Sequence, residues 1–346
     1  NSFSMKLAIL FLVAIIGIAL ISSVPLTHTF AKISKEHKAI DKAISNTASW
    51  KSICDVGISV AANKSLDRVF HKDNNRCNGI TPPPQPTSCP IGDFNHTKFV
   101  RVGVTADTKV AGKEFTLIHN CGVQINLVAG DLWYTGTSNA WFAAVEKLGW
   151  TKGNTDIAVG NHDGDGSAIK NWLGFTSTWN QWNTPDGKVD VFAINANTDF
   201  KCGSTQFNKI KGWIEGSDAW YKLVIVHQPF VTGKSTHANN GQFSCYNPLF
   251  KANGVDVVAQ GHNHNNQLFV IDNIFYTVGG VGTHDSSGSL YNITSPSDGQ
   301  GHTAIFTNDK DNAILFLDMQ IDVPTAHKII GNFVGLNGQI LNSFQN

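Results

Sequence analysis

The stretch VQINLVAGDLWY, residues 123–134, is the pattern around which the rest of the chain is organised. It is an apolar strand that ends abruptly at Gly130-Asp131, and Tyr134 follows three positions after the carboxylate. A strand that delivers an aspartate on a glycine turn places a metal ligand at the edge of a sheet. One such turn decides little, so the question is whether other strands end in complementary ligands.

Four further apolar segments are followed by Asp, Asn or His, residue types that can bind metals. They are residues 99–105 before Asp107, 156–159 before Asn161-His162-Asp163, 223–226 before His227, and 255–259 before His262 and His264. Helices are predicted between the strands, over residues 138–147 and 206–215, and residues 166–182 are helical or irregular. This alternation predicts a central sheet with helices outside, and in such folds ligands gather beyond the carboxyl ends of the strands.

The remaining segments read mainly as strands. They cover residues 189–195, 268–271, 274–278 and 313–321, followed by a hairpin turned at Asn337-Gly338. Upstream, residues 32–70 have helical periodicity, and a proline-rich connector follows from Pro82. We therefore divide the chain into a targeting segment (5–31), a helical appendage with its linker (32–97) and a main domain (98–346).

The five polar strand ends suit two metal ions held about 3.5 Å apart. Carboxylates, imidazoles and an amide oxygen favour Fe, Mn or Zn over copper. Each residue taken alone also has a structural interpretation. Tyr134 could be a packed aromatic, Asp107 a cap, and His227 a buried histidine with a satisfied hydrogen bond, while Asp163 is expected to orient its neighbours.

These five motifs, in this order, resemble the calcineurin-like metallophosphoesterase superfamily, and the Gly-Asp-x-x-Tyr form resembles its purple acid phosphatase branch, of the tartrate-resistant type. The resemblance covers about residues 98–344. It implies a four-layer α/β (α+β) sandwich of two mixed β-sheets flanked by helices, with metals at the C-terminal strand ends. It also implies hydrolysis of phosphomonoesters by a hydroxide that the two metals activate and that attacks phosphorus in line with the leaving group.

The resemblance further assigns roles to individual residues. Asp131 would bridge the metals, and the remaining ligands would be Asp107, Tyr134 and His264 for Fe(III), and Asn161, His227 and His262 for Fe(II), Zn or Mn. His162 would bind phosphate or protonate the leaving group, and His237 is a second candidate acid. One position departs from the family pattern, because Lys109 stands where such proteins have His or Gly. Its stem could point to solvent, its ammonium could contact phosphate, or its charge could weaken metal binding.

Other features of the sequence place the chain in the secretory pathway. Residues 7–24 form a nearly unbroken apolar run after Met5-Lys6, which predicts a signal peptide or signal anchor. Six cysteines predict three disulfides, whose pairing the sequence leaves open. Sequons at Asn63, Asn95 and Asn292 permit glycosylation. We expect a secreted, vacuolar or lysosomal protein, or one anchored in a membrane and facing the lumen or exterior.

The bulk composition narrows the class of partner. The net charge is zero and no basic block is present, so nucleic acid is not an expected partner. The three arginines, Arg68, Arg76 and Arg101, offer few candidates for a phosphate clamp. Three functions stay open: an acid phosphatase, a catalytically weak or inactive membrane-tethered scaffold with a phosphatase-like domain, and a related phosphodiesterase or nucleotidase. The sequence identifies no protein partner.

Overall fold

The computed structural model of the protein describes residues 89–92, 95–109, 112–134, 136–279 and 290–346, which all lie in the compact unit Thr81–Asn346. The predicted targeting segment, the predicted appendage up to residue 88, the sequon at Asn63, and Cys54 and Cys77 lie outside these residues. Among the described helices, none has the length and apolar character needed to span a membrane.

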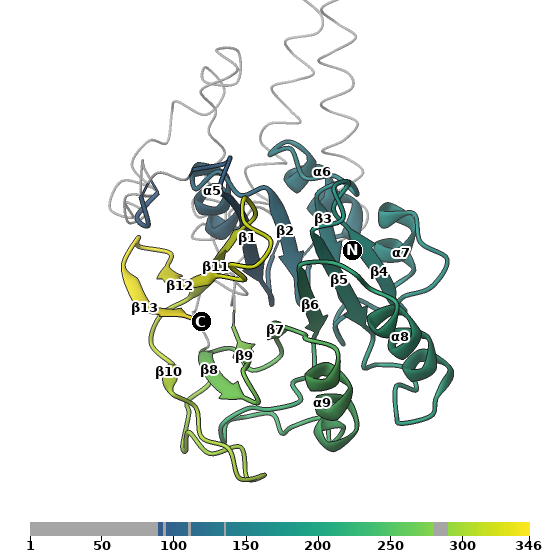
Figure 1. Cartoon of the computed structure of the whole chain (residues 1–346). Coiled ribbons are helices and arrows are strands. Elements are labelled where there is room, and N and C mark those ends of the chain that lie inside the picture. The colour runs from purple at the N-terminus through teal and green to yellow at the C-terminus, as the bar shows by residue number, and fades with distance from the viewer. Residues whose placement is uncertain (1–88, 93–94, 110–111, 135, 280–289) are drawn as a thin grey trace, which may run out of the picture. The chain divides into compact units, whose positions relative to one another are not determined.

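Two mixed β-sheets form the centre of the domain (Figure 1). The first has the order β13-β12-β11-β1-β2-β3 and consists of β1 (Phe99–Thr105), β2 (Ile125–Val128), β3 (Thr155–Ile157), β11 (Ala313–Gln320), β12 (Ile329–Gly335) and β13 (Ile340–Gln345). The strands β1, β2 and β3 are parallel, whereas β11, β12 and β13 join by antiparallel pairing.

The second sheet has the order β10-β8-β9-β7-β6-β5-β4. Its strands are β4 (Asn180–Asn183), β5 (Val189–Ile194), β6 (Tyr221–Val226), β7 (Val257–Gln260), β8 (Asn266–Ile271), β9 (Ile274–Val278) and β10 (Phe306–Asn308). Its central strands β5, β6, β7 and β9 are parallel. In each sheet the parallel strands therefore bring their carboxyl ends to one edge.

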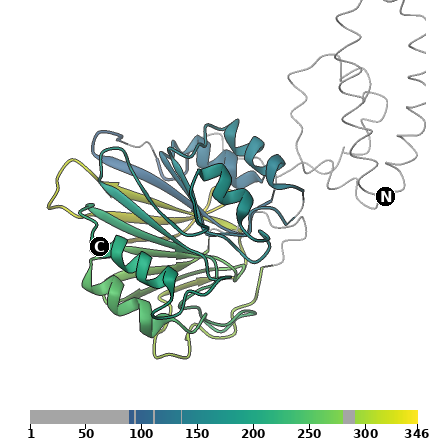
Figure 2. The same ribbon diagram turned by 90° about the vertical axis from the view of Figure 1, so that its right-hand side faces the viewer.

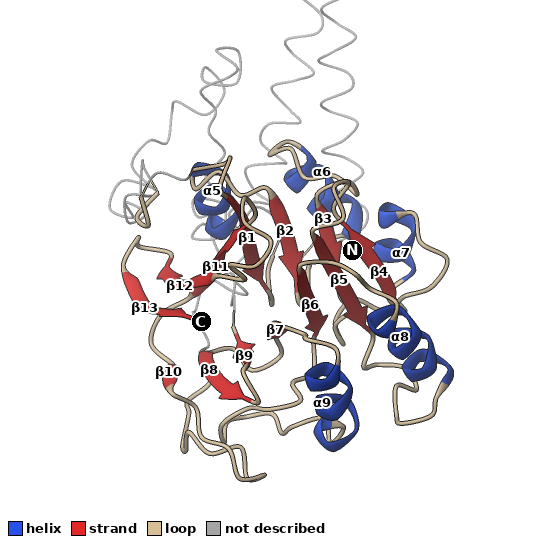
Figure 3. Ribbon diagram, in the orientation of Figure 1, coloured by secondary structure: helices blue, strands red, loops and turns tan. Residues whose placement is uncertain are grey.

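The five described helices cover the outer faces of the two sheets (Figures 2 and 3). They are α5 (Lys113–Asn120), α6 (Ser138–Glu146), α7 (Ser167–Leu173), α8 (Thr205–Glu215) and α9 (Phe243–Ala252). Side chains of α5, α6 and α7 share an apolar core with the first sheet, and those of α8 and α9 share one with the second. A third core lies between the sheets. The four-layer sandwich of two mixed sheets is confirmed, whereas one central sheet, predicted from the alternation alone, is wrong.

Strand alternation explains how both faces of each sheet are buried. In β5, Val189, Val191 and Ala193 enter the core between the sheets, and Phe192 and Ile194 enter the core beneath α8 and α9. Successive side chains of a strand point to opposite faces. A strand that carries apolar side chains on both faces therefore sits between two layers, as β5 does.

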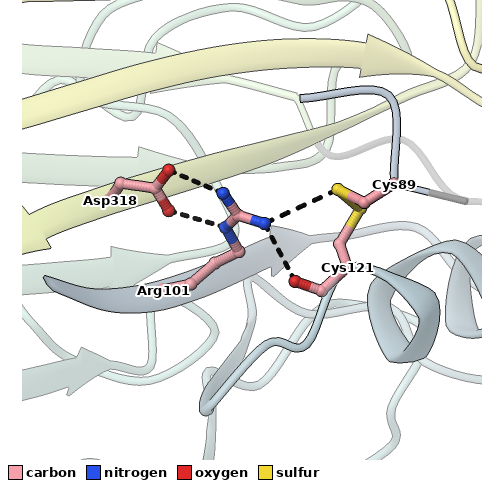
Figure 4. The surroundings of a disulfide bond; sticks show 4 residues. All are labelled: Cys89, Arg101, Cys121 and Asp318. Carbon is pink, nitrogen blue, oxygen red and sulfur yellow. Dashed lines mark hydrogen bonds and ion pairs between the residues drawn. A yellow bond between two sulfur atoms is a disulfide. The ribbon is translucent and has the colours of Figure 1, made fainter. Parts of the chain in front are cut away.

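Two disulfides lie among the described residues, Cys89–Cys121 and Cys202–Cys245. The first joins the end of the predicted linker to the turn after α5, and Arg101 of β1 lies against it (Figure 4). The Arg101 side chain is 2% exposed, donates through Nη1 to the Cys121 carbonyl at 2.9 Å, and forms two bonds to Asp318 at 2.7 and 2.8 Å. Arg101 is thus a structural residue rather than part of a phosphate clamp.

Candidate metal centre

Three of the predicted ligands occupy strained backbone positions directly after their strands. Asp107, Asp131 and His262 have φ values of 53°, 55° and 70°, in the left-handed region that non-glycine residues rarely adopt. Such a conformation costs on the order of 1 kcal/mol or more for each residue and is concentrated at functional sites. Here it turns the three side chains back toward one another across the ends of the strands.

Close packing of the turns depends on glycine. A Cβ atom on Gly160 would lie 2.1 Å from Oδ1 of Asp131, and one on Gly130 would lie 2.8 Å from both the Gly160 nitrogen and the His227 Cβ. The Asp107 and Asp131 turns are also joined through their backbones, since Asp107 N donates to Gly130 O at 3.0 Å and Thr108 N donates to Asp131 O at 2.8 Å. Gly130 is therefore required both by contact and by its left-handed backbone, with a φ of 84°, and Gly160 is required by contact.

The first cluster of side chains converges on the hydroxyl of Tyr134. This hydroxyl lies 2.6 Å from Oδ2 of Asp131, 3.0 Å from Oδ1 of Asp107 and 3.0 Å from Nε2 of His264. Burial and the charges of the two carboxylates raise the pKa of the phenol, so without a cation it keeps its proton. A single hydroxyl proton faces two carboxylates and an imidazole, and a cation would be coordinated by all four groups.

The second cluster converges on Nε2 of His227. That atom lies 3.1 Å from Oδ2 of Asp131, 3.1 Å from Oδ1 of Asn161 and 3.2 Å from Nδ1 of His262. The other ring nitrogen, Nδ1, is 2.8 Å from the carbonyl of Ala129, which can only accept, so Nδ1 carries a hydrogen. In the neutral ring the Nε2 lone pair therefore faces the acceptor oxygens of Asp131 and Asn161.

A cation would satisfy all the acceptor atoms around Nε2 of His227, and a proton satisfies them only in part. Burial lowers the pKa of His227, but the charges of Asp131 and Asp107 outweigh this and raise it to about 9. A proton on Nε2 satisfies one neighbour at a time, whereas a metal ion is shared by all of them. One ligand atom each from Asp131, His227 and His262 lies within 4.8 Å of the others. The donor set therefore fits a metal ion, and Asp131 belongs to both clusters.

The two histidines predicted to act as acids lie beside these clusters. His162 donates its backbone N–H to Oδ1 of Asp131 at 2.7 Å, and its exposed ring is 4.5 Å from the Tyr134 ring. The ring of His237 stacks on that of His262, with centroids 3.8 Å apart. The structure thus brings all nine predicted site residues to one region.

Asp163 orients its neighbours, as expected. Its carboxylate accepts backbone hydrogen bonds from Asp131, Leu132 and Gly160 at 2.8–2.9 Å. It therefore fastens the turn carrying Asp131 to the turn carrying Asn161.

A buried amide beside the predicted ligands His262 and His264 was not predicted to have a role. Asn263 is fully buried, accepts from the His237 nitrogen and donates to the His237 carbonyl, both at 2.9 Å. Its position within Gly-His-Asn-His was visible in the sequence, but its partner lies 26 residues away in the chain. Only the packing of the two loops shows that Asn263 holds His237 in place.

Comparison with known proteins places this geometry in a family. Residues 101–266 match the model of the calcineurin-like phosphoesterase family. Over these residues the chain is similar to calcineurin-like phosphoesterases. The predicted resemblance to the superfamily is thereby confirmed. A comparison with curated protein sequences gave no match.

Solved structures agree on the fold. The purple acid phosphatase PPD1 from yellow lupin (Lupinus luteus) seeds aligns with a TM-score of 0.56 and 16% identity, over 71% of this chain and 53% of that chain. The Plasmodium protein GAP50, described as the anchor in the inner membrane complex, aligns with a TM-score of 0.52 and 15% identity, over 71% of this chain and 88% of that chain. The chain thus spans about half the length of the lupin enzyme and most of the length of GAP50.

Proposed function

We propose that the chain is a metal-dependent phosphomonoesterase of the purple acid phosphatase type. The observation that carries the proposal is the contact of the Tyr134 hydroxyl with Asp107, Asp131 and His264 at 2.6–3.0 Å. A phenol held between two carboxylates and an imidazole is the donor set expected for a trivalent ion. The fold of the phosphoesterase domain and its likeness to the lupin enzyme support this proposal.

Asp131 would be shared between two metal ions. Asp107, Tyr134 and His264 would complete a first site for Fe(III), and Asn161, His227 and His262 would complete a second site for Fe(II), Zn or Mn. When bound, the two ions supply an activated water and offset the charge of the phosphoryl group. The chain's own contribution is to hold the donors in place, through the Ala129 carbonyl at His227 and the three backbone bonds to Asp163.

Proton delivery is assigned to His162. Its ring is exposed beside Tyr134, while its backbone is fixed to Asp131, so the imidazole is free to reach the oxygen of a leaving group. His237, stacked on His262, is a second candidate on the other side of the cluster. We also propose a secretory-pathway location, which the two disulfides support.

A second candidate function is a membrane-tethered scaffold without strong activity. GAP50 is an anchor in a membrane complex, and it has the same fold over most of its length. The half-buried Lys109, two residues after Asp107, would oppose a cation. Against this stands the convergence of seven donor side chains, which a scaffold does not need.

The deciding experiment is metal analysis of the purified full chain, followed by visible spectroscopy and assay with p-nitrophenyl phosphate. We expect about two metal ions per chain, a visible tyrosinate-to-iron charge-transfer band that is lost in Tyr134→Phe, and turnover in acid. A chain that binds no iron or zinc when these are supplied, and that turns over no ester, would leave the scaffold as the function.

A further inference from the structure

A cavity of about 460 Å³ lies beside the candidate metal centre. Its walls come from two loops, residues 232–239 after β6 and residues 295–299 before β10. His237 lines the cavity and stacks its ring on that of His262, 3.8 Å away. Cavities of about 300–1,000 Å³ are the size of small-molecule sites, so a substrate bound at the metals has space for its leaving group here.

Partly buried hydrogen bonds hold the walls of the cavity in place. Asn239 accepts from the Thr232 nitrogen and donates to the Asp298 carbonyl, both at 2.8 Å, and so ties the two loops together. Lys234 forms a backbone bridge with Ser295, donating to its carbonyl at 2.8 Å. Asn263 holds the backbone of His237 through two hydrogen bonds. A site held in this way loses little entropy when a ligand binds.

The cavity lining contains two charged side chains, Asp298 and Lys234, and only Lys234 is available to a ligand. The Asp298 carboxylate is turned into its own loop, where it accepts from the nitrogens of Gln300 and His302 and from Nδ1 of His302. Lys234 is the lysine among the lining residues, its side chain is exposed, and no ion pair joins it to an acidic group within the described residues. A compact ammonium group of this kind attracts a carboxylate or a phosphate.

We propose that this cavity binds the leaving group of the substrate, and that Lys234 selects phosphoesters whose leaving group carries a second anion. This rests on the proposed function and adds a substrate class to it. A phosphorylated carboxylic acid and a bisphosphate share the required chemistry. Lys234 is a specificity residue here, since it contacts the part of the substrate away from the reacting phosphorus.

The test uses two phosphonates that cannot be hydrolysed, so that binding is measured whether or not the chain turns over esters. Isothermal titration of the metal-loaded full chain compares 3-phosphonopropanoate, which carries a carboxylate, with propylphosphonate, which has a neutral tail of similar length. We expect the carboxylate to bind about tenfold more tightly, the typical effect of one charge-assisted hydrogen bond. A bisphosphonate in the same titration distinguishes a phosphate from a carboxylate as the second anion.

The preference should fall to about twofold or less in Lys234→Gln and persist in Lys234→Arg, because only the first removes the charge. Lys209→Gln, which removes an exposed charge on α8, is the matched control and should keep the wild-type preference. Equal binding of the two phosphonates in the wild type, no binding of either, or an unchanged preference in Lys234→Gln would each overturn the proposal. A selective protein that hydrolyses no ester would retain the anion site and refute only the proposed activity.

Discussion

Strand β1 carries a buried charge near each of its ends, and the two are neutralised in different ways. Near its start, Arg101 is paired with Asp318 through two hydrogen bonds and lies against a disulfide. Just past its other end, Asp107 is fully buried, and within the described residues it and Asp131 contact imidazoles and a phenol but form no ion pair with a lysine or arginine. The charge at one end is neutralised by another residue of the chain, and the carboxylates at the other end could be neutralised by a bound cation. Stability is therefore expected to depend on the first end, and function on the second.

Substitution in the candidate metal centre, beyond the end of β1 (the metal end), should have the largest effect on activity. Asp131→Asn replaces the shared carboxylate by an amide, which removes a negative charge and places an NH2 group among the donors around Tyr134 and His227. We expect phosphatase turnover to fall by at least about a thousandfold, equivalent to about 4 kcal/mol, with loss of bound metal. The measurements are kcat/KM with p-nitrophenyl phosphate and metal content by mass spectrometry.

The matched control for this variant is Asp186→Asn, an aspartate whose side chain is 50% exposed and which lies outside both clusters. It should retain full metal content and activity. If Asp131→Asn kept both as well, the bridging assignment would be refuted.

Disrupting the Arg101–Asp318 pair near the start of β1 should lower the free energy of unfolding and leave metal binding intact. Arg101→Met removes one partner of a buried pair and leaves the Asp318 carboxylate without its cation. Because Asp318 retains 14% exposure, we expect the low end of the usual penalty, about 3 kcal/mol in the free energy of unfolding. Urea denaturation measures this change.

The double variant Arg101→Met/Asp318→Leu is the control for this prediction. It removes both charges and should recover part of the loss, because no unpaired carboxylate remains. A single variant as stable as the wild type would show that the pair adds nothing to stability, and metal loss in it would show that the two ends of β1 are coupled.

The candidate ligands were predictable because they follow strands directly. An apolar run that ends in Gly-Asp or Gly-His predicts both the strand and the turn after it. The groups that hold the ligands were less visible. Asn263 contacts His237 across 26 residues of sequence, and such contacts depend on how distant loops pack.

The fold was predictable to a similar degree. Most strands lie within a residue or two of the predicted bounds, but the division into two sheets came from the resemblance, because alternation along the chain does not say which strands pair. Helix α9 was missed, and it contains Pro248, which usually marks a break in a helix. Helix α5 and the three-residue strand β10 were also missed, and β4 fell in a segment expected to be helical or irregular.

A buried carboxyl group in β3 is neutralised in another way, by a proton. Asp156 of β3 is fully buried, and desolvation raises its pKa to about 7 even though Ile157 and Asn180 donate hydrogen bonds to it. The folded chain therefore binds a proton between about pH 4 and pH 7 that the unfolded chain releases, and stability falls as pH rises through this window. In Asp156→Asn this dependence disappears, since the amide is neutral at every pH.

We expect Asp156→Asn to gain about 2 to 3 kcal/mol relative to the wild type when the pH is raised from 5 to 8. Urea unfolding of both proteins at the two pH values measures the difference, in which titrations elsewhere in the chain cancel. Parallel pH profiles for the two proteins would mean that Asp156 is ionised in the folded state and has found a partner other than a proton.

The smallest effect concerns the lysine nearest to the metal end. Lys109 is half-buried two residues after Asp107, so its charge adds to that of any cation held there. At several ångströms and a high effective dielectric this repulsion is worth about 1 kcal/mol, so Lys109→Gln should tighten metal binding by about three- to fivefold. Competition titration with a chelator measures the affinity, and Lys109→Gly separates the effect of charge from that of the stem. If both variants bind metal as the wild type does, the ammonium is screened by solvent and the metal end is free of opposing charge. A gain of a hundredfold or more would instead mean that Lys109 suppresses metal binding in the native chain, which would favour the scaffold over the enzyme.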